Sequence, residues 1–402
     1  QPGRGGMNVD VFLDDDRRAR RDEAGRVAAA FPARAAENDR LARFPAENFA
    51  DLAGAGLLSL AVPAELGGGG ADYLDFSLVA EQIARGDAST SLCFTMHTAG
   101  VATALAGDDD QRRRTLAHLA DGAVFTVVFT EPGSGAHFMQ PDMTATPVDG
   151  GYRLNGAKSF ATSAGAADVV VVNAVVDGTP DGAFSLFLVE PKSNPGIEVA
   201  GQWDAMGMRA NDSRSLRFSD AFVASTERLG AEGEGKALVL SRPNYIALGL
   251  ATTSVGIAQA ALDMAVEHAT TRVVAPGTEP IASYQAIQFL VAEMAIATTA
   301  MRLMATTAAV TADRQPEAAG AAMTQAKAFC NEQGFAVANK GLQVVGGRGY
   351  VRGHRAERLV RDARAGDLMA LTAQQCREAV GRGVLGLDQP PPPPSDEAGR
   401  PA

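Results

Sequence analysis

A glycine-containing segment follows an apolar run in the first half of the chain, and its residue types could bind an anionic or electron-rich group. The run 124–129 is typical of a strand, and Thr130-Glu131-Pro132-Gly133-Ser134-Gly135 follows it directly. Because glycine has no Cβ, backbone N–H groups at the end of such a strand can approach an anion or an aromatic ring without side-chain interference. The segment is therefore the first candidate for a cofactor-binding loop.

The elements that must position this loop change in character twice along the chain. The pattern is helical from about residue 14 to 121, strand-like from 124 to about 223 and helical again after Gly235. In the last third, helices are expected at 237–271, 284–312, 318–341 and 357–364. The sequence thus predicts an α+β fold: an N-terminal helical domain (10–123), a middle β-barrel or β-sandwich domain (124–232) and a C-terminal four-helix bundle (233–388). A start segment at 1–9, which looks like a cloning remnant or disordered start, and a Pro-rich disordered tail at 389–402 flank them.

Composition excludes several classes of protein. The chain has 402 residues, 46% of them hydrophobic, and a formal net charge of -11, so it can bury a large core but offers no basic surface for nucleic acid or an anionic membrane. Three widely spaced cysteines indicate neither a disulfide framework nor a Cys-based metal site, and they fit a reducing cytoplasm. The longest apolar run, 246–266, contains Asp263 and several polar residues, which favours a buried helix over a membrane span. We expect no metal, no nucleic acid and no membrane as partners.

Two segments near the C-terminus resemble the signature of the acyl-CoA dehydrogenase family. They are Gln343-Val344-Val345-Gly346-Gly347-Arg348-Gly349-Tyr350 and Glu357-Arg358-Leu359-Val360-Arg361-Asp362-Ala363-Arg364. In the family they lead into a Glu-Gly-Thr turn that carries the catalytic base, whereas here the turn reads Ala370-Leu371-Thr372. The resemblance extends from about Val11 to Asp388. It implies an acyl-CoA dehydrogenase-like fold, FAD, and oxidation of an acyl thioester of CoA or a carrier protein at the α,β carbons, with hydride transfer to flavin N5.

The same resemblance assigns residues around the flavin ring. The loop Phe129, Thr130 to Gly135 is similar to the family's Thr-Glu-Pro-Gly-x-Gly-Ser-Asp loop, but it continues as Ala136-His137 and so lacks one serine donor. The segment 155–163 resembles Lys-x-Trp-Ile-Thr-Asn, which implies that Phe160 packs on the isoalloxazine and that the Thr162 hydroxyl bonds N5. Phenylalanine keeps the packing contact but lacks the indole donor. An ordinary amphipathic strand with a buried phenylalanine is the alternative.

Further cofactor contacts are implied at the adenine and pyrophosphate end, which in the family lies across a dimer interface. The matching residues are Arg272, Gln285, Gln343 and Gly347, with Thr372 and Gln374 after the catalytic turn. A guanidinium near a pyrophosphate makes charge-assisted, often bidentate bonds. The family's Arg-x-x-Phe-Gly motif is altered after Arg272, which predicts looser FAD binding or a reshaped loop. A homodimer or homotetramer is expected.

Both positions at which family members place their base lack a carboxylate. One is Ala370 and the other is Ser241, ahead of Arg242. Substitute bases are Tyr245, His97 and Asp367, whose plainer interpretations are a pocket wall, a helix-packing residue and a solvated loop acid. The backbone N–H of Ala370 remains able to polarise a thioester carbonyl. Ser241, Arg242, Tyr245 and Ala370 are thus expected to contact substrate.

Three functions stay open on the sequence. The first is an acyl-CoA or acyl-carrier-protein dehydrogenase with a relocated or solvent-derived base and an electron-acceptor flavoprotein as partner. The second is a flavin-dependent monooxygenase on the same fold, supplied by a flavin reductase. The third is a non-catalytic flavin or acyl-thioester binding protein. The high Ala, Gly and Arg content suggests a GC-rich bacterial source.

Overall fold

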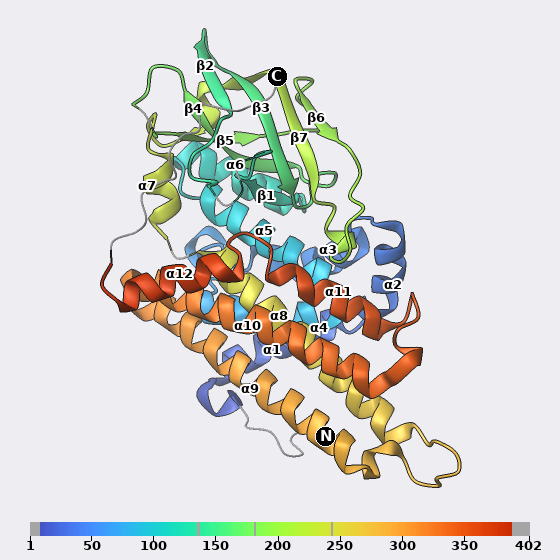
Figure 1. The fold of residues 1–402 in the computed structure, drawn as a ribbon. Coiled ribbons are helices and arrows are strands. Elements are labelled where there is room, and N and C mark those ends of the chain that lie inside the picture. Colours follow the sequence, from blue (N-terminus) through green and yellow to red (C-terminus); the bar gives the residue numbers. More distant parts are fainter. Residues whose placement is uncertain (1–8, 134, 136, 181, 243, 388–402) are drawn as a thin grey trace.

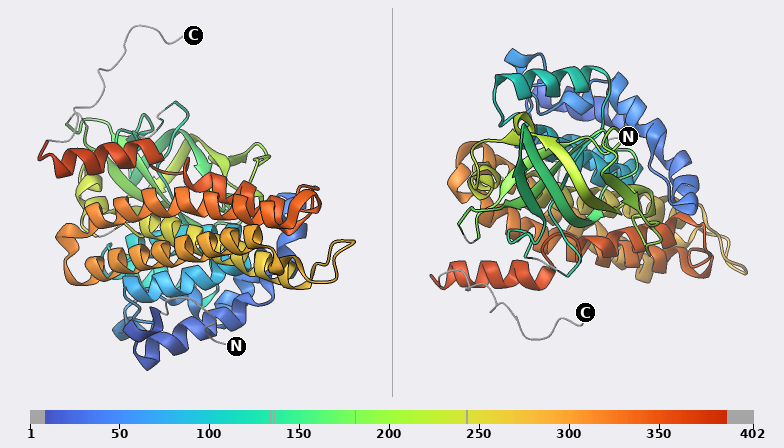
Figure 2. Two further views of the ribbon diagram at one scale, coloured as in Figure 1. Left: turned by 60° about the horizontal axis from the view of Figure 1, so that its bottom comes forward. Right: turned by 90° about the horizontal axis from the view of Figure 1, so that it is seen from above.

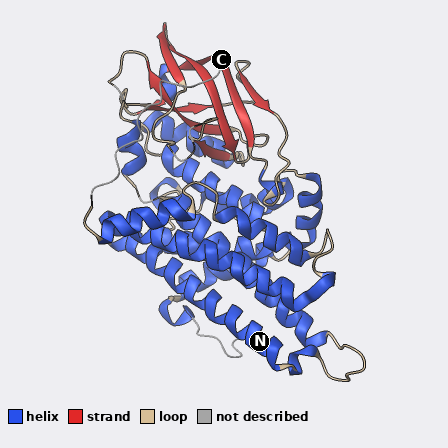
Figure 3. Ribbon diagram, viewed as in Figure 1, coloured by secondary structure: helices blue, strands red, loops and turns tan. Residues whose placement is uncertain are grey.

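The structure is a computed structural model that describes residues 9–133, 135, 137–180, 182–242 and 244–387. The predicted tail at 389–402 and, apart from Val9, the predicted start segment at 1–9 lie outside the described residues. Strands gather at one end of the molecule and helices from both ends of the chain form the remainder (Figures 1 and 3). The predicted order of helical, β and helical parts is confirmed.

Six helices and three short 3-10 segments precede the sheet. The α-helices are α1 (Asp15–Ala28), α2 (Phe31–Leu41), α3 (Ala46–Gly54), α4 (Tyr73–Gly86), α5 (Ala88–Ala104) and α6 (Asp109–Ala120). Four of them begin after an aspartate, at positions 14, 72, 87 and 108, whose side chain accepts the backbone N–H three residues on. Such caps satisfy one of the N–H groups that a helix start leaves unpaired.

The middle domain is an eight-stranded mixed sheet. Its strands are β1 (Phe125–Val128), β2 (Thr144–Val148), β3 (Gly151–Ala161), β4 (Val169–Val176), β5 (Ser185–Val189), β6 (Ile197–Ala200), β7 (Arg214–Ala224) and β8 (Arg228–Leu229). The strand order is β6-β7-β3-β2-β4-β5-β8, and β1 pairs in parallel with β4. Every residue of β1 and β5 is buried, which explains why these strands read as unbroken apolar runs.

The C-terminal helices differ from the sequence prediction at two places. They are α7 (Gly235–Leu240), α8 (Tyr245–Thr271), α9 (Gln285–Arg314), α10 (Pro316–Val345), α11 (Arg355–Gly366) and α12 (Ala373–Val384). The single helix predicted at 237–271 is wrong, because the chain leaves α7 at Ser241 and the Asn244 side chain caps α8. A proline at 243 also disfavours helix at the residue before it. Helix α12 was not predicted, although Thr372 and Gln375 form a capping box at its start.

Helix α8 lies in the centre of the helical layers. It packs against α4 and α5 on one side and against α9, α10 and α11 on the other (Figures 1 and 2). Helices α8 and α9 are each long and apolar enough to cross a membrane, by length and composition. The apolar window of α8 is 72% buried inside the protein, so the predicted buried helix is confirmed, whereas that of α9 is 22% buried.

Helix α11 ties the three parts of the chain together. The Arg361 guanidinium donates to both carboxylate oxygens of Asp39 on α2 and to the carbonyl of Met206 in the middle domain. Beside it, the buried Asp362 accepts the N–H of Met208 at 2.7 Å. Burial raises the pKa of Asp362 to about 7, against the opposing effects of that hydrogen bond and of Arg358. The joint between α11 and the 206–208 turn therefore contains a carboxyl group that is difficult to ionise.

We expect Asp362→Asn to remove most of the pH dependence that this joint adds to stability. The folded pKa of about 7 lies above the ordinary value of 3.8, so the folded protein binds more protons than the unfolded chain between these values. The contribution of Asp362 to the free energy of unfolding should therefore fall as pH rises from about 4 to about 7, by on the order of 3–4 kcal/mol. Chemical denaturation from pH 4 to 8 should show that the stability of wild type relative to the variant falls by this amount, whereas the exposed Asp149→Asn should leave the wild-type profile intact. A difference between wild type and variant that stays constant over this range would contradict the assignment.

Candidate active site

The loop after β1 is anchored to the sheet by a buried ion pair. The Lys158 ammonium on β3, which is fully buried, donates to Glu131 Oε1 and to Asn173 Oδ1, each at 2.6 Å. Glu131 also accepts the N–H groups of Asp142 and Met143. Burial lowers the pKa of Lys158 to about 8 despite the attraction of Glu131. Both ends of the segment 131–142 are thus fixed to the sheet.

Between these anchors the glycine loop is open. Gly133 and Gly135 have φ values of +87° and +52°, and a Cβ added at either would meet no atom within 4 Å. The left-handed backbone, rather than close packing, is what requires glycine here. Phe129 and Thr130, both half-buried, lead into the loop, and the Thr130 carbonyl accepts the N–H of Ser159 on β3. Ser134 and Ala136 lie outside the described residues.

Phe160 is held in a conformation that suits contact with a planar ring. Its φ is 53°, in the left-handed region that non-glycine residues rarely adopt, and it is 67% exposed. The alternative of a buried phenylalanine in an ordinary strand is therefore wrong. Trp203 lies edge-on to it, with ring centroids 6.2 Å apart, and is fixed by a hydrogen bond from Nε1 to the Met208 carbonyl. A strained, exposed aromatic beside an open glycine loop fits an isoalloxazine.

Thr162 is buried next to a second hydroxyl that the sequence did not single out. Its Oγ1 lies 3.0 Å from Ser213 Oγ, and its carbonyl accepts a hydrogen bond from Thr126. Two hydroxyls that share one hydrogen bond leave one O–H proton free to donate elsewhere. The pair can therefore supply the donor that the resemblance implies for a flavin nitrogen.

The turn between α11 and α12 carries Ala370. Its φ is 54°, it is exposed, and its backbone N–H has no hydrogen-bond partner among the described residues. Thr372 starts α12, and its hydroxyl accepts the N–H of Gln375, while Gln374 is exposed one residue into the helix. The turn thus presents an unpaired donor at the residue that the resemblance matches to the family's base, with the N-terminus of α12 directly behind it.

Two of the three substitute bases are poorly placed to accept a proton. His97 is fully buried: Nδ1 accepts the N–H of Phe125 at 3.1 Å and Nε2 lies 2.9 Å from the Leu58 carbonyl. Burial lowers the pKa of His97 to about 4. Tyr245 stacks on Tyr73 with ring centroids 4.4 Å apart, and burial raises its pKa well above the ordinary value. His97 and Tyr245 therefore have packing roles.

Asp367, the third substitute, lies in the same turn as Ala370. It is buried, not solvated as its plainer interpretation supposed, and it forms an ion pair with Arg364 at 2.5 Å through Oδ2. Its Oδ1 is buried without a hydrogen-bond partner in the described structure. The ion pair holds the Asp367 side chain against Arg364 at the end of α11.

Ser241 and Arg242 occupy the linker between α7 and α8. The Ser241 hydroxyl donates to the Leu238 carbonyl at 2.7 Å, and Arg242 donates to the Ala102 carbonyl at the end of α5 at 2.9 Å. Both residues precede α8, which begins at Tyr245, so Ser241 and Tyr245 do not share the single helix that was predicted at 237–271. Their contacts are with backbone carbonyls of the protein.

The remaining predicted cofactor residues form a second, distant group. Arg272 directly follows α8, Gln285 starts α9, Gln343 lies in the last turn of α10 and Gly347 lies just after that helix. The turn that carries Ala370 contacts α8 at Ser254. Ser254 lies about 27 Å along the helix axis from Arg272. This distance exceeds the separation of the ring and the pyrophosphate in one FAD molecule. The Ala370 turn and the residues around Arg272 are therefore well separated within one subunit.

The group of residues around Arg272 is cationic. His268, Arg272, Arg348 and His354 lie close together, and the pKa of His268 is lowered first by burial and then by Arg272, His354 and Arg348. The guanidinium groups of Arg272 and Arg348 have no acidic partner in the described part of the chain. A cluster of unpaired cations fits a diphosphate, because guanidinium groups bind phosphate oxygens in a bidentate manner.

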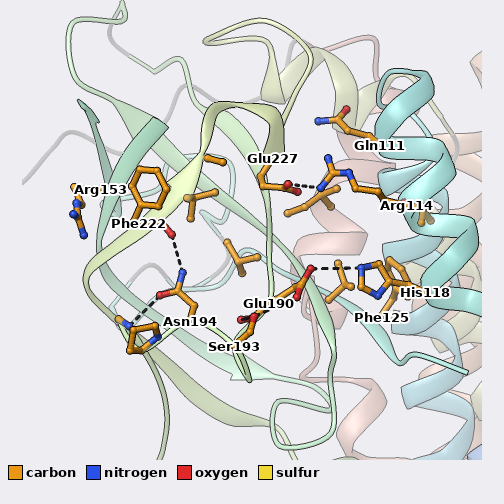
Figure 4. Close-up of a pocket in the computed structure, with 18 of the residues that line it drawn as sticks. Gln111, Arg114, His118, Phe125, Arg153, Glu190, Ser193, Asn194, Phe222 and Glu227 are labelled. Carbon is orange, nitrogen blue, oxygen red and sulfur yellow. Dashed lines mark hydrogen bonds and ion pairs between the residues drawn. The ribbon is translucent and has the colours of Figure 1, made fainter. Parts of the chain in front are cut away.

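A separate cavity of about 440 Å³ lies between α6 and the sheet (Figure 4). Its charged groups are already matched: Arg114 pairs with Glu227, and His118 lies 3.5 Å from Glu190. None of the predicted site residues lines it. The cavity is therefore distinct from the candidate site.

Comparisons with known proteins cover nearly the whole chain. Models of the acyl-CoA dehydrogenase N-terminal, middle and C-terminal domains match residues 14–123, 126–221 and 233–385. The mitochondrial short-chain specific acyl-CoA dehydrogenase of Bos taurus is 33% identical over 87% of this chain and 85% of its own length. The cyclohex-1-ene-1-carbonyl-CoA dehydrogenase of Geobacter metallireducens is 34% identical over 88% and 93%. The structure of a glutaryl-coenzyme A dehydrogenase glutaryl-CoA complex is 27% identical with a TM-score of 0.88, over 95% and 98% of the two chains.

We expect FAD to quench the fluorescence of Trp203. This is the only tryptophan in the chain, and it lies against Phe160, so a flavin ring packed on Phe160 would be within reach of direct quenching. Titration of the apoprotein should give a saturable loss of emission. The matched variant Phe160→Ala should weaken the response, whereas Phe222→Ala, at an exposed sheet position, should not. Bound flavin that leaves the emission unchanged would place the ring elsewhere.

Proposed function

Because the chain belongs to the acyl-CoA dehydrogenase family, we propose that it oxidises an acyl thioester at the α,β carbons with a solvent-derived base in place of the family's glutamate. The protein is an FAD-dependent flavoenzyme of this family. One observation carries the proposal: Ala370 has an unpaired backbone N–H on an exposed turn held in a left-handed conformation. The titration described below determines whether the thioester carrier is CoA or a carrier protein.

In this proposal each residue of the site has a separate role. FAD, when bound, supplies the hydride acceptor for the β hydrogen. The exposed ring of Phe160 packs against the cofactor, and the Thr162–Ser213 hydroxyl pair donates one hydrogen bond to it. The N–H of Ala370 donates to the thioester carbonyl and so acidifies the α C–H. The α proton passes to water, because the Ala370 methyl is exposed and leaves the volume of a glutamate side chain free.

An anaerobic titration of the FAD-loaded protein with a panel of acyl-CoAs and acyl-carrier proteins tests the activity. Loss of the oxidised-flavin absorption band, together with formation of the α,β-unsaturated thioester, is the expected result. An unchanged flavin spectrum, with oxygen-dependent product formation once reduced flavin is supplied, would instead make the protein a monooxygenase. No reaction in either assay would indicate that the protein binds flavin or acyl thioester without catalysis.

We also propose that a second copy of the chain completes each cofactor site. We call Phe160 and Thr162 the ring half-site and the residues around Arg272 the cationic half-site. In this proposal the two lie too far apart in one subunit to share one FAD, so a neighbouring subunit brings its Arg272 to the ring half-site. Helix α9 offers a surface for this contact, because Phe289 is 60% and Ile296 is 71% exposed on it. Exposed apolar side chains on one helix face favour association.

We expect Ala370→Glu to raise acyl-CoA oxidation by about 10²- to 10⁴-fold, the usual contribution of a positioned base. Residue 370 already adopts the left-handed conformation with a Cβ, so the substitution adds little backbone strain. Flavin reduction by stopped-flow absorbance is the measurement. Ala370→Gln has the same shape without basicity and should stay at the wild-type rate. Equal rates for all three proteins would argue against dehydrogenase geometry at this turn.

Disrupting α9 should weaken FAD binding although every contact within the subunit remains. The double variant Phe289→Glu/Ile296→Glu buries charges in the proposed interface and should give monomers. Loss of charge-assisted bonds from the neighbour's cationic half-site should then reduce FAD affinity roughly 10- to 100-fold. Mass photometry and FAD titration check both effects, with the exposed Val148→Glu on β2 as control. Monomers with wild-type affinity would exclude a shared site.

A further inference from the structure

A buried lysine lies beneath the turn that carries Ala370. Lys327 on α10 is 2% exposed, and its ammonium donates to the Leu371 carbonyl at 2.5 Å and to the Gly366 carbonyl at 3.4 Å. No carboxylate forms an ion pair with it among the described residues. Burial lowers its pKa. A buried ammonium is costly unless its surroundings use its charge and its donors.

A neighbouring side chain on the same helix holds the other end of the turn. Asn331, one helical turn after Lys327, donates from Nδ2 to the Gly366 carbonyl at 2.7 Å. Its Oδ1 accepts a hydrogen bond from Ser254 on α8 at 2.8 Å, which fixes the orientation of the amide. The carbonyls of Gly366 and Leu371 are therefore both held from α10, one on each side of Asp367–Ala370.

The clamped segment contains the only backbone strain in the turn. Ala370 has a φ of 54°, and Leu368 and Ala370 are exposed, so their side chains do little to hold the conformation. Lys327 binds the Leu371 carbonyl, in the peptide group that links Leu371 to Thr372. With the Gly366 carbonyl held before the turn, this contact restrains both ends of the segment that carries the Ala370 N–H, and a catalytic donor needs a direction defined to within a few tenths of an ångström.

We propose that Lys327, assisted by Asn331, is a positioning residue that aims the backbone N–H of Ala370 at the thioester carbonyl and favours the enolate that forms there. This inference rests on the proposed thioester site. Lys327 contacts neither substrate nor cofactor and acts through two backbone carbonyls. Its positive charge, close to the turn, adds to the stabilisation of negative charge on the thioester oxygen.

The test uses acetoacetyl-CoA bound to the FAD-loaded protein, because this β-ketoacyl thioester forms an ultraviolet-absorbing enolate without needing a base at 370. A hydrogen bond to the enolate oxygen lowers the pKa of the bound α C–H below its value in solution. Lys327→Met should raise that pKa by about one unit or more, a tenfold loss of acidification. Asn331→Ser should produce a smaller rise and remains informative should Lys327→Met fail to fold.

The control is Lys340→Met, on the same helix, whose ammonium pairs with Glu293 at the surface. It should leave the pKa of bound acetoacetyl-CoA unchanged. Hydrogen–deuterium exchange over residues 366–372 should increase in the Lys327 and Asn331 variants and not in the control. Faster exchange with an unchanged acetoacetyl-CoA pKa would reduce Lys327 to a structural residue and overturn the inference, as would no change in either readout. Wild-type protein that leaves the pKa at its solution value would instead refute the thioester site itself.

Discussion

The close packing of α8 is the constraint on which the rest of the structure depends. Two glycines allow it: a Cβ on Gly249 would lie 2.3 Å from Thr95 on α5, and one on Gly256 would lie 2.6 Å from the Glu81 carbonyl on α4. At Gly256 the neighbours include backbone and at Gly249 the neighbour is the β-branched side chain of Thr95, so neither position has room for a Cβ. On the opposite face, Ser254 meets Asn331 and Gly366. Helix α8 thus fixes the positions of the N-terminal domain, α10 and the Ala370 turn relative to one another.

The sheet must then be placed accurately against this helical block, and α11 does so through polar contacts. Arg361 and Asp362 bind the 206–208 turn, which also carries the partner carbonyl of Trp203. The aromatic ring pair at Phe160 and the Ala370 turn are therefore linked through α11. A hydrophobic interface alone would leave their separation less well defined, because apolar contacts are non-directional.

The sequence was sufficient for features set by local pattern. The apolar run 124–129 predicted β1, the strand-like pattern to about 223 predicted the middle domain, and the glycine loop and the fold followed from short motifs. Features that depend on distant contacts could not be predicted. Ser213 becomes the partner of Thr162, and Trp203 that of Phe160, only because β7 and the preceding turn fold back onto β3. The break at 241–244 was signalled by Pro243 and Asn244, and apolar periodicity obscured it.

Under the proposed function, the clamp on the turn also explains how residue 370 can be an alanine while the turn keeps its conformation. The conformation at residue 370 is imposed through the carbonyls of Gly366 and Leu371, which belong to the backbone and persist whatever side chain occupies the position. Carbonyl activation by the N–H and proton removal by the side chain are therefore physically separable functions. An alanine at 370 provides the first and not the second. The left-handed φ costs about the same for alanine and for glutamate, since each has a Cβ.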